Sequence, residues 1–223
     1  QDHWYHKKDI KYLANKKPNI FSIKKIFNQK KTSKYLFIHI PKTGGTSFKF
    51  NVIYNPRLKK QIEIYHNISY PPRKVRLLNI FKEKRKMFTL LRDPTDTIIS
   101  AYYHFKHLVK VKNFVFFDQV SNMQTKFLLG YDIFSDYKIK TNEFDDLIKL
   151  IDDKKLIVGI QKRKSMIKIY NLLELRFDEV DNYILNKKVG ISYKKKDVSD
   201  NLREYIKKNN NFDYRLFDYV MNS

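Results

Sequence analysis

Short apolar runs alternate along the chain with longer segments in which apolar residues recur every three or four positions. The short runs predict buried strands, and the periodic segments predict amphipathic helices. The strand-like runs cover residues 35–40, 61–66, 87–91 and 156–160. The helical segments cover residues 95–107, 121–130, 141–151, 165–175, 199–208 and 213–220. This alternation is typical of a single α/β domain with a central parallel sheet flanked by helices.

Three helix starts carry capping signals. Asp93 suits an N-cap because Pro94 can occupy the first helical position. Thr141 and Ser199 are predicted to cap the helices that follow them. In the last helix the apolar spacing predicts that the aromatic and aliphatic side chains face the core, namely Tyr214, Phe217 and Val220.

The segment 34–48 joins a predicted strand, a turn and the start of a helix. The turn reads Pro41-Lys-Thr-Gly-Gly-Thr-Ser47, in which the proline ends the strand and the glycines free the backbone. A strand, loop and helix in this order direct unpaired N–H groups and the positive end of a helix dipole toward one point. With the lysine ammonium and two hydroxyl side chains, the segment predicts an anion-binding loop.

The order of residues differs from that of a Walker A loop. There the lysine follows the glycines and directly precedes Ser or Thr, whereas Lys42 precedes Gly44 and Gly45. This order disfavours a magnesium–nucleotide hydrolase. A tight turn without a ligand is the alternative, but such a turn needs neither the lysine nor the hydroxyl residues.

A second block reads Met87-Phe-Thr-Leu-Leu-Arg-Asp-Pro94. Arg92 follows the carboxyl end of the predicted strand, where ligands bind in open α/β sheets. A guanidinium can hold a terminal phosphate through two parallel hydrogen bonds. A structural salt bridge is the alternative for Arg92 alone, but its pairing with the first loop favours a binding role.

Together these blocks resemble sulfotransferases that use 3′-phosphoadenylyl sulfate (PAPS). The sequence Ile38-His-Ile-Pro-Lys-Thr-Gly-Gly-Thr-Ser47 most resembles the carbohydrate branch, which includes the heparan sulfate and uronyl 2-O-sulfotransferases. Arg92-Asp-Pro94, with Ser100 six residues after the proline, resembles the family's 3′-phosphate motif. The resemblance implies a P-loop-NTPase-like fold over residues 34–223, PAPS as co-substrate, 3′-phosphoadenosine 5′-phosphate (PAP) as product, and no metal.

The resemblance also assigns the binding residues. Arg92 and Ser100 would hold the 3′-phosphate. The 5′-phosphosulfate would be held by Lys42, Thr43, Gly44, Gly45, Thr46 and Ser47. In the family, a loop closes over the nucleotide in the region that corresponds to a lysine-rich run of this chain. The candidates for that contact are Lys194, Lys195 and Lys196, and a solvated charge run is the alternative. Segment 121–130 resembles a family segment near the acceptor cleft. Residues 158–162 also resemble the family, with Gln161 where Glu is commoner.

Sulfuryl transfer to a hydroxyl needs a general base, usually His or Glu. In the 2-O-sulfotransferases this base is a histidine in a Tyr-His-Gly-His stretch, which residues 65–68 match in part. His66 is therefore the first candidate and Glu63 the second. His104 and His107 are further candidates that also suit packing or surface roles, and His39 suits a buried strand.

The composition bears on partners. The chain of 223 residues has 46 Lys and Arg against 23 Asp and Glu, a net charge of +23, and no cysteine. Such a charge favours polyanions, although a lysine-rich background composition would contribute. The expected acceptor is a hydroxyl of an acidic oligo- or polysaccharide rather than nucleic acid. Absence of cysteine excludes disulfides and Cys-based metal sites.

The amino-terminal residues 1–33 are read as a lysine-rich arm with a short helix. Because the chain begins with Gln, a preceding anchor or signal is possible, so a membrane contact stays open. The location is either the Golgi lumen or a bacterial cytoplasm. Two other functions stay open: a nucleotide-dependent phosphoryl transferase, which lacks a clear Walker B acid here, and a non-catalytic polyanion-binding module.

Overall fold

The structure is a computed structural model. It describes residues 33–45, 48–49, 52, 55–65, 85–105, 113–161, 163–174 and 198–223. The chain divides into two units, Gln1–Thr32 and Ser33–Ser223, and all described residues lie in the second. The predicted arm over 1–33 therefore lies, apart from Ser33, outside the described residues.

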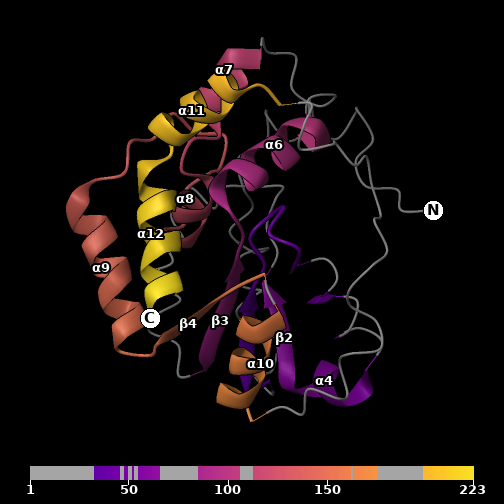
Figure 1. Cartoon of the computed structure of the whole chain (residues 1–223). Coiled ribbons are helices and arrows are strands. Elements are labelled where there is room, and N and C mark those ends of the chain that lie inside the picture. Colours follow the sequence, from indigo (N-terminus) through magenta and orange to yellow (C-terminus); the bar gives the residue numbers. More distant parts are fainter. Residues whose placement is uncertain are drawn as a thin grey trace, which may run out of the picture. The chain divides into compact units, whose positions relative to one another are not determined.

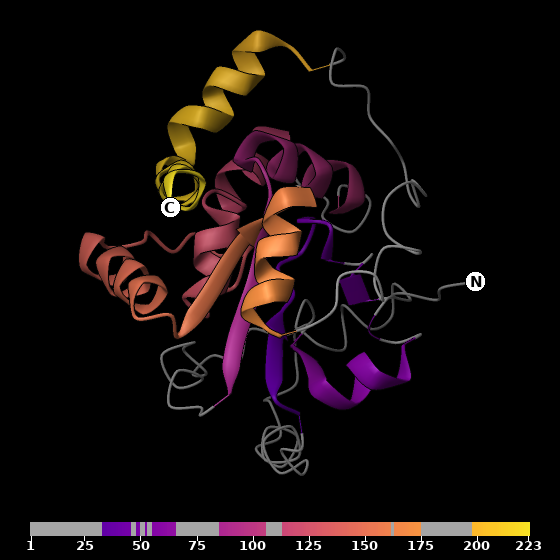
Figure 2. The same cartoon turned by 60° about the horizontal axis from the view of Figure 1, so that its bottom comes forward.

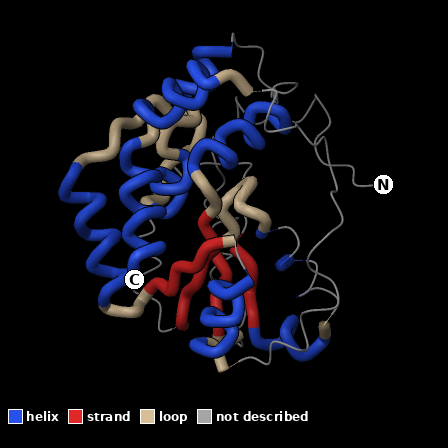
Figure 3. Tube along the Cα trace, in the orientation of Figure 1, coloured by secondary structure: helices blue, strands red, loops and turns tan. Residues whose placement is uncertain are grey.

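Four parallel strands form one sheet in the described part of the chain (Figures 1 and 3). They are β1 (Tyr35–Ile38), β2 (Ile62–Tyr65), β3 (Lys86–Leu91) and β4 (Leu156–Ile160), in the order β2-β1-β3-β4. Each neighbouring pair is parallel. The predicted α/β class with a parallel sheet flanked by helices is confirmed.

Successive strand residues point to opposite faces of the sheet, so each strand serves two cores. Leu36 and Ile38 belong to one core, and Tyr35 and Phe37 belong to the other. The helices that pack on the first core are α6 (Pro94–Phe105), α7 (Asn113–Gln119), α8 (Met123–Leu128), α9 (Thr141–Asp152), α11 (Asp200–Asn209) and α12 (Asn211–Asn222).

The second core is completed by α4 (Pro56–Gln61) and α10 (Arg163–Leu172). Figure 2 shows α10 on one side of β4, with α9 and α12 on the other. Gly159 of β4 allows α10 to approach closely, because a Cβ atom there would lie 2.2 Å from Cδ1 of Ile169. The hydrophobic pattern does not predict α4 or α7.

Two predicted caps are confirmed and one is wrong. Asp93 accepts a hydrogen bond from the N–H of Asp96 (2.8 Å), and Ser199 accepts one from the N–H of Leu202 (3.3 Å). At α9 the N-cap is Lys140 rather than Thr141, which is already helical. The carboxylate of Glu143 accepts from the Lys140 N–H (3.1 Å), and this contact moves the start of the helix by one residue.

Helices α8 and α12 cap each other. The carboxylate of Asp213 accepts hydrogen bonds from the N–H groups of Gln124 (3.1 Å) and Thr125 (2.8 Å). In return, Oδ1 of Asn122 accepts from the N–H groups of Phe212 (2.9 Å) and Asp213 (3.1 Å). Four N–H groups that helix starts leave without intrahelical partners are satisfied in this way.

The last helix is oriented partly as predicted, because Phe217 and Val220 pack against the first core, but its most buried positions differ. Its fully buried side chains are Asp213 and Leu216, whereas Tyr214, Phe217 and Val220 are only partly buried. The apolar spacing could not reveal that a carboxylate is turned inward, because its partners lie about 90 residues earlier in the chain.

Candidate functional site

The two loops predicted to bind phosphate leave adjacent strands. From β1 the chain runs to β2 on one side and then to β3 on the other side of β1, as the strand order requires. The carboxyl ends of β1 and β3 therefore form a topological switch point, the place where open α/β sheets bind ligands. In Figure 3, loop segments follow the strands at this edge.

The loop after β1 has an unusual backbone. Lys42 has φ 67° and Gly44 has φ 84°, both left-handed, whereas Thr43 between them is not in that region. Such alternation of backbone handedness gathers successive N–H groups into a concavity that favours anions. The Thr43 hydroxyl donates to the carbonyl oxygen of Ile40 (2.9 Å) and is fully buried, so this side chain stabilises the turn.

Both loop glycines lie close to neighbouring side chains. A Cβ at Gly44 would lie 2.1 Å from Nε2 of Gln161, and a Cβ at Gly45 would lie 2.1 Å from Cδ2 of His39. The His39 ring is buried, as expected, and stacks with Phe37 at 5.7 Å between ring centroids. The loop is thus supported by the end of its own strand and by the residue after β4.

Arg92 connects the two motifs. Its Nη1 donates to the carbonyl oxygen of Lys42 (3.4 Å), and its Nη2 lies 3.8 Å from a carboxylate oxygen of Asp96. The salt bridge that is the alternative for this arginine occurs, through Asp96, and the binding of a phosphate by Arg92 stays a prediction. Ser100 lies one helical turn beyond Asp96 on the same side of α6 and is half-buried.

The site is electrostatically positive. Burial lowers the pKa of the Lys42 ammonium, and the charge of Arg92 lowers it further. Burial also lowers the pKa of His104, and the charge of Lys42 adds to that effect. Perturbed pKa values are common at binding and catalytic sites. Three cationic or ionisable groups from β1's loop, β3's end and α6 thus influence one another, as an anion site requires.

The structure separates Glu63 from this site. Its carboxylate pairs with Arg85 and lies 3.5 Å from the hydroxyl of Ser33. Arg85 directly precedes β3 and Ser33 lies two residues before β1, at the amino-terminal edge of the sheet, whereas the loop of Lys42 follows the carboxyl end of β1. This placement favours a structural ion pair over a role of Glu63 as general base.

Several predicted residues lie outside the described part of the chain. These are Thr46, Ser47, His66, His107, Lys194, Lys195 and Lys196. The described residues on either side of the two hydroxyl positions, Gly45, Phe48 and Lys49, are helical. The helix is therefore already under way at Gly45, one residue before the start predicted at Thr46.

Two glutamines contribute contacts that spacing alone does not predict. The N–H of Gln161 donates to the carbonyl oxygen of Leu91 (2.8 Å), which continues the sheet ladder beyond β4. The side-chain amide of Gln124, in α8, accepts a hydrogen bond from the N–H of Arg92 and donates one to the carbonyl oxygen of Arg92. The sequence signal for Gln124 is weak, because it is only one polar residue in a helix that is buried throughout.

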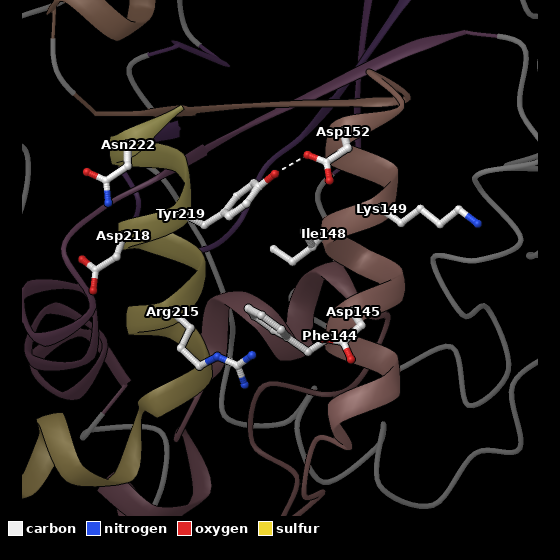
Figure 4. Close-up of a pocket in the computed structure, with 9 residues that line it drawn as sticks. All are labelled: Phe144, Asp145, Ile148, Lys149, Asp152, Arg215, Asp218, Tyr219 and Asn222. Atoms are coloured by element: carbon white, nitrogen blue, oxygen red, sulfur yellow. Dashed lines mark hydrogen bonds between the residues drawn. The ribbon is translucent and has the colours of Figure 1, made fainter.

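A groove of about 580 Å³ lies elsewhere, between α9 and α12 (Figure 4). Its walls carry Asp145, Asp152, Asp218 and Arg215, and the hydroxyl of Tyr219 donates to Asp152 across it. None of the predicted site residues lines this groove, so it is separate from the loop of Lys42.

Among the described residues, no group of three or more His, Asp or Glu side chains is arranged to hold a metal ion. Within that same part of the chain, no helix has both the length and the apolar character needed to cross a bilayer. Comparison with protein-family models and with curated proteins finds no match to this chain.

Proposed function

We propose that the protein is a PAPS-dependent sulfotransferase with a P-loop-like fold that acts on a hydroxyl of an acidic glycan. The observation that carries the proposal is the hydrogen bond from Arg92 to the carbonyl of Lys42 at the β1/β3 switch point. It joins two motifs, fifty residues apart, that would hold opposite ends of one bisphosphorylated nucleotide. A strand order beginning 2-1-3 also occurs in flavodoxin-like folds, so the motifs, rather than the sheet, support the P-loop-like assignment.

The residues present fit such a ligand. Left-handed backbone at Lys42 and Gly44 supports an anion-binding concavity for the 5′-phosphosulfate. Arg92 and Ser100 supply a guanidinium and a hydroxyl for the 3′-phosphate. The lowered pKa of Lys42 reflects burial beside another cation, a cost that a bound dianion would offset.

In the reaction, the sulfur–oxygen bond to phosphate breaks and a new one forms to the acceptor oxygen. Lys42 would stabilise the charge that develops on the leaving phosphate, and the loop N–H groups would hold it in line. The acceptor proton passes to a base, for which His66 is proposed from the resemblance. His104 is the second candidate because its pKa responds to the charge of Lys42.

Calorimetric titration tests the proposal. Wild-type protein and Arg92→Ala are titrated with 3′-phosphoadenosine 5′-phosphate and, separately, with ATP and magnesium. Metal-independent binding of the bisphosphate that is lost in the variant supports the proposal. Preference for magnesium–ATP would assign a phosphoryl transferase instead. Binding of neither would leave a basic polyanion-binding protein.

A further inference from the structure

The backbone of Arg92 is held by one side chain from a distant helix. The N–H of Arg92 donates to Oε1 of Gln124 (3.1 Å), and Nε2 of Gln124 donates to the carbonyl oxygen of Arg92 (2.9 Å). A primary amide that binds both groups of one residue imitates a neighbouring strand. Gln124 therefore continues the ladder of β3 at the point where the strand ends.

Gln124 is itself tightly constrained. It is 1% exposed, and its own N–H donates to Oδ2 of Asp213 (3.1 Å). The other oxygen of that carboxylate binds the N–H (2.8 Å) and the hydroxyl (2.7 Å) of Thr125. Burial raises the pKa of Asp213. The hydrogen bonds from Gln124 and Thr125 compensate the carboxylate for its loss of water, as a buried charged group requires.

We propose that Gln124 is the positioning residue for Arg92, fixing where its guanidinium stands relative to the loop of Lys42. This inference rests on the proposed function, in which Arg92 holds the 3′-phosphate. The direct restraint falls on the backbone, and the side chain then reaches the Lys42 carbonyl and Asp96 from a fixed origin. A small displacement of that origin would misalign a bidentate phosphate contact, because such contacts depend on geometry.

The segment that holds Gln124 is thereby given a specific role. Within the segment 121–130, Gln124 contacts the phosphate motif, and the placement of this segment near an acceptor cleft stays a prediction. Asp213 lies about 90 residues beyond α8, so the carboxyl-terminal helix contributes to this positioning through the cap it provides. Helix α12 thus belongs to the support of the nucleotide site.

A double-mutant cycle tests the inference. Gln124→Met keeps the side-chain volume while removing both hydrogen bonds, and Gln124→Glu keeps the shape while removing the donor to the Arg92 carbonyl. Calorimetry measures binding of 3′-phosphoadenosine 5′-phosphate and of adenosine 5′-phosphate, which lacks the 3′-phosphate. We expect the preference for the bisphosphate to fall about tenfold in either variant, whereas the same Gln124 changes made in Arg92→Ala should cause no further fall.

Thr125→Val serves as the matched control. It removes a hydroxyl bond to the same Asp213 from the same helix without touching Arg92, so it should lower the melting temperature and leave the ligand preference unchanged. Equal losses for both ligands in the Gln124 variants, or additive losses with Arg92→Ala, would overturn the inference and leave the proposed function standing. A wild-type protein without preference for the bisphosphate would overturn both.

Discussion

Arg92 acts on Lys42 in two opposite ways. Its guanidinium donates a hydrogen bond to the Lys42 carbonyl oxygen (3.4 Å), while its charge lowers the pKa of the Lys42 ammonium. The first contact holds the loop against the end of β3, and the second is an electrostatic repulsion between the two cations. A bound dianion would reverse the repulsion, so ligand affinity and the charge state of Lys42 should be coupled.

Replacing Lys42 should affect turnover more than binding. In Lys42→Met we expect kcat for sulfate transfer from PAPS to de-O-sulfated heparin to fall about 10²- to 10³-fold, because this ammonium would act mainly on charge that develops during transfer. Lys49→Met, a helical position in the same segment, removes an equal charge and should change kcat little. Similar small effects of both substitutions would instead show that Lys42 does not stabilise the charge that develops during transfer.

His104 should report on occupancy of the site. Its pKa in the free protein is below the ordinary histidine value of about 6.5, because of burial and the charge of Lys42. A bound phosphate cancels that charge, so the pKa should rise when 3′-phosphoadenosine 5′-phosphate is added. NMR titration of the imidazole measures both values. In Lys42→Met the starting pKa should already be higher, and an unchanged starting value there would contradict the described coupling.

Lys126 predicts an unusual dependence of stability on pH. Burial lowers its pKa to about 8, and its ammonium donates to the carbonyl oxygens of Gln119 (3.0 Å) and Ser135 (2.6 Å). In the unfolded chain the pKa is about 10.4, so between these values the unfolded state binds more protons and stability rises with pH. The free energy of unfolding of the wild type, relative to Lys126→Met, should therefore increase from pH 7 to pH 10 in urea titrations. A difference that stays flat with pH would show that Lys126 titrates normally.

Replacing Asn122 should lower the free energy of unfolding. It combines a left-handed backbone (φ 51°) with the cap of α12. Asn122→Ala should lose the cap, worth about 1 kcal/mol, and place alanine in a conformation that costs about 1–2 kcal/mol more. Asn122→Gly loses the cap but tolerates the backbone, so it should be the less destabilised variant in urea unfolding. The reverse ranking would mean that the left-handed backbone at this position costs alanine little.

Features set by neighbours in sequence could be predicted. The strands 87–91 and 156–160, and the caps at Asp93 and Ser199, follow from composition and spacing within a few residues. Helix α4 was predictable on the same basis, because Asn55 accepts from the N–H groups of Arg57 (3.0 Å) and Leu58 (3.2 Å) with Pro56 at the first position. The hydrophobic pattern misses it because the helix buries only Leu58.

Features set by distant partners could not be predicted. The loop of Lys42 was interpreted as an anion site from its residues, but its contact with Arg92 depends on strand order. Glu63 is a weaker candidate for the base because it pairs with Arg85, which lies 22 residues later in the chain. Gln124 and Asp213 look like ordinary helix residues in the sequence, and only tertiary packing turns their polar groups toward Arg92 and the start of α8.

The left-handed conformation of Lys42 has a consequence for laboratory evolution. A non-glycine residue in that region costs of the order of 1–2 kcal/mol, and burial of its ammonium adds to the cost. Lys42→Gly would relieve both, so selection for thermal tolerance alone should favour losing this lysine. Variants chosen for heat resistance without a parallel screen for nucleotide binding would then be enriched in proteins that are more stable but have lost the proposed nucleotide site.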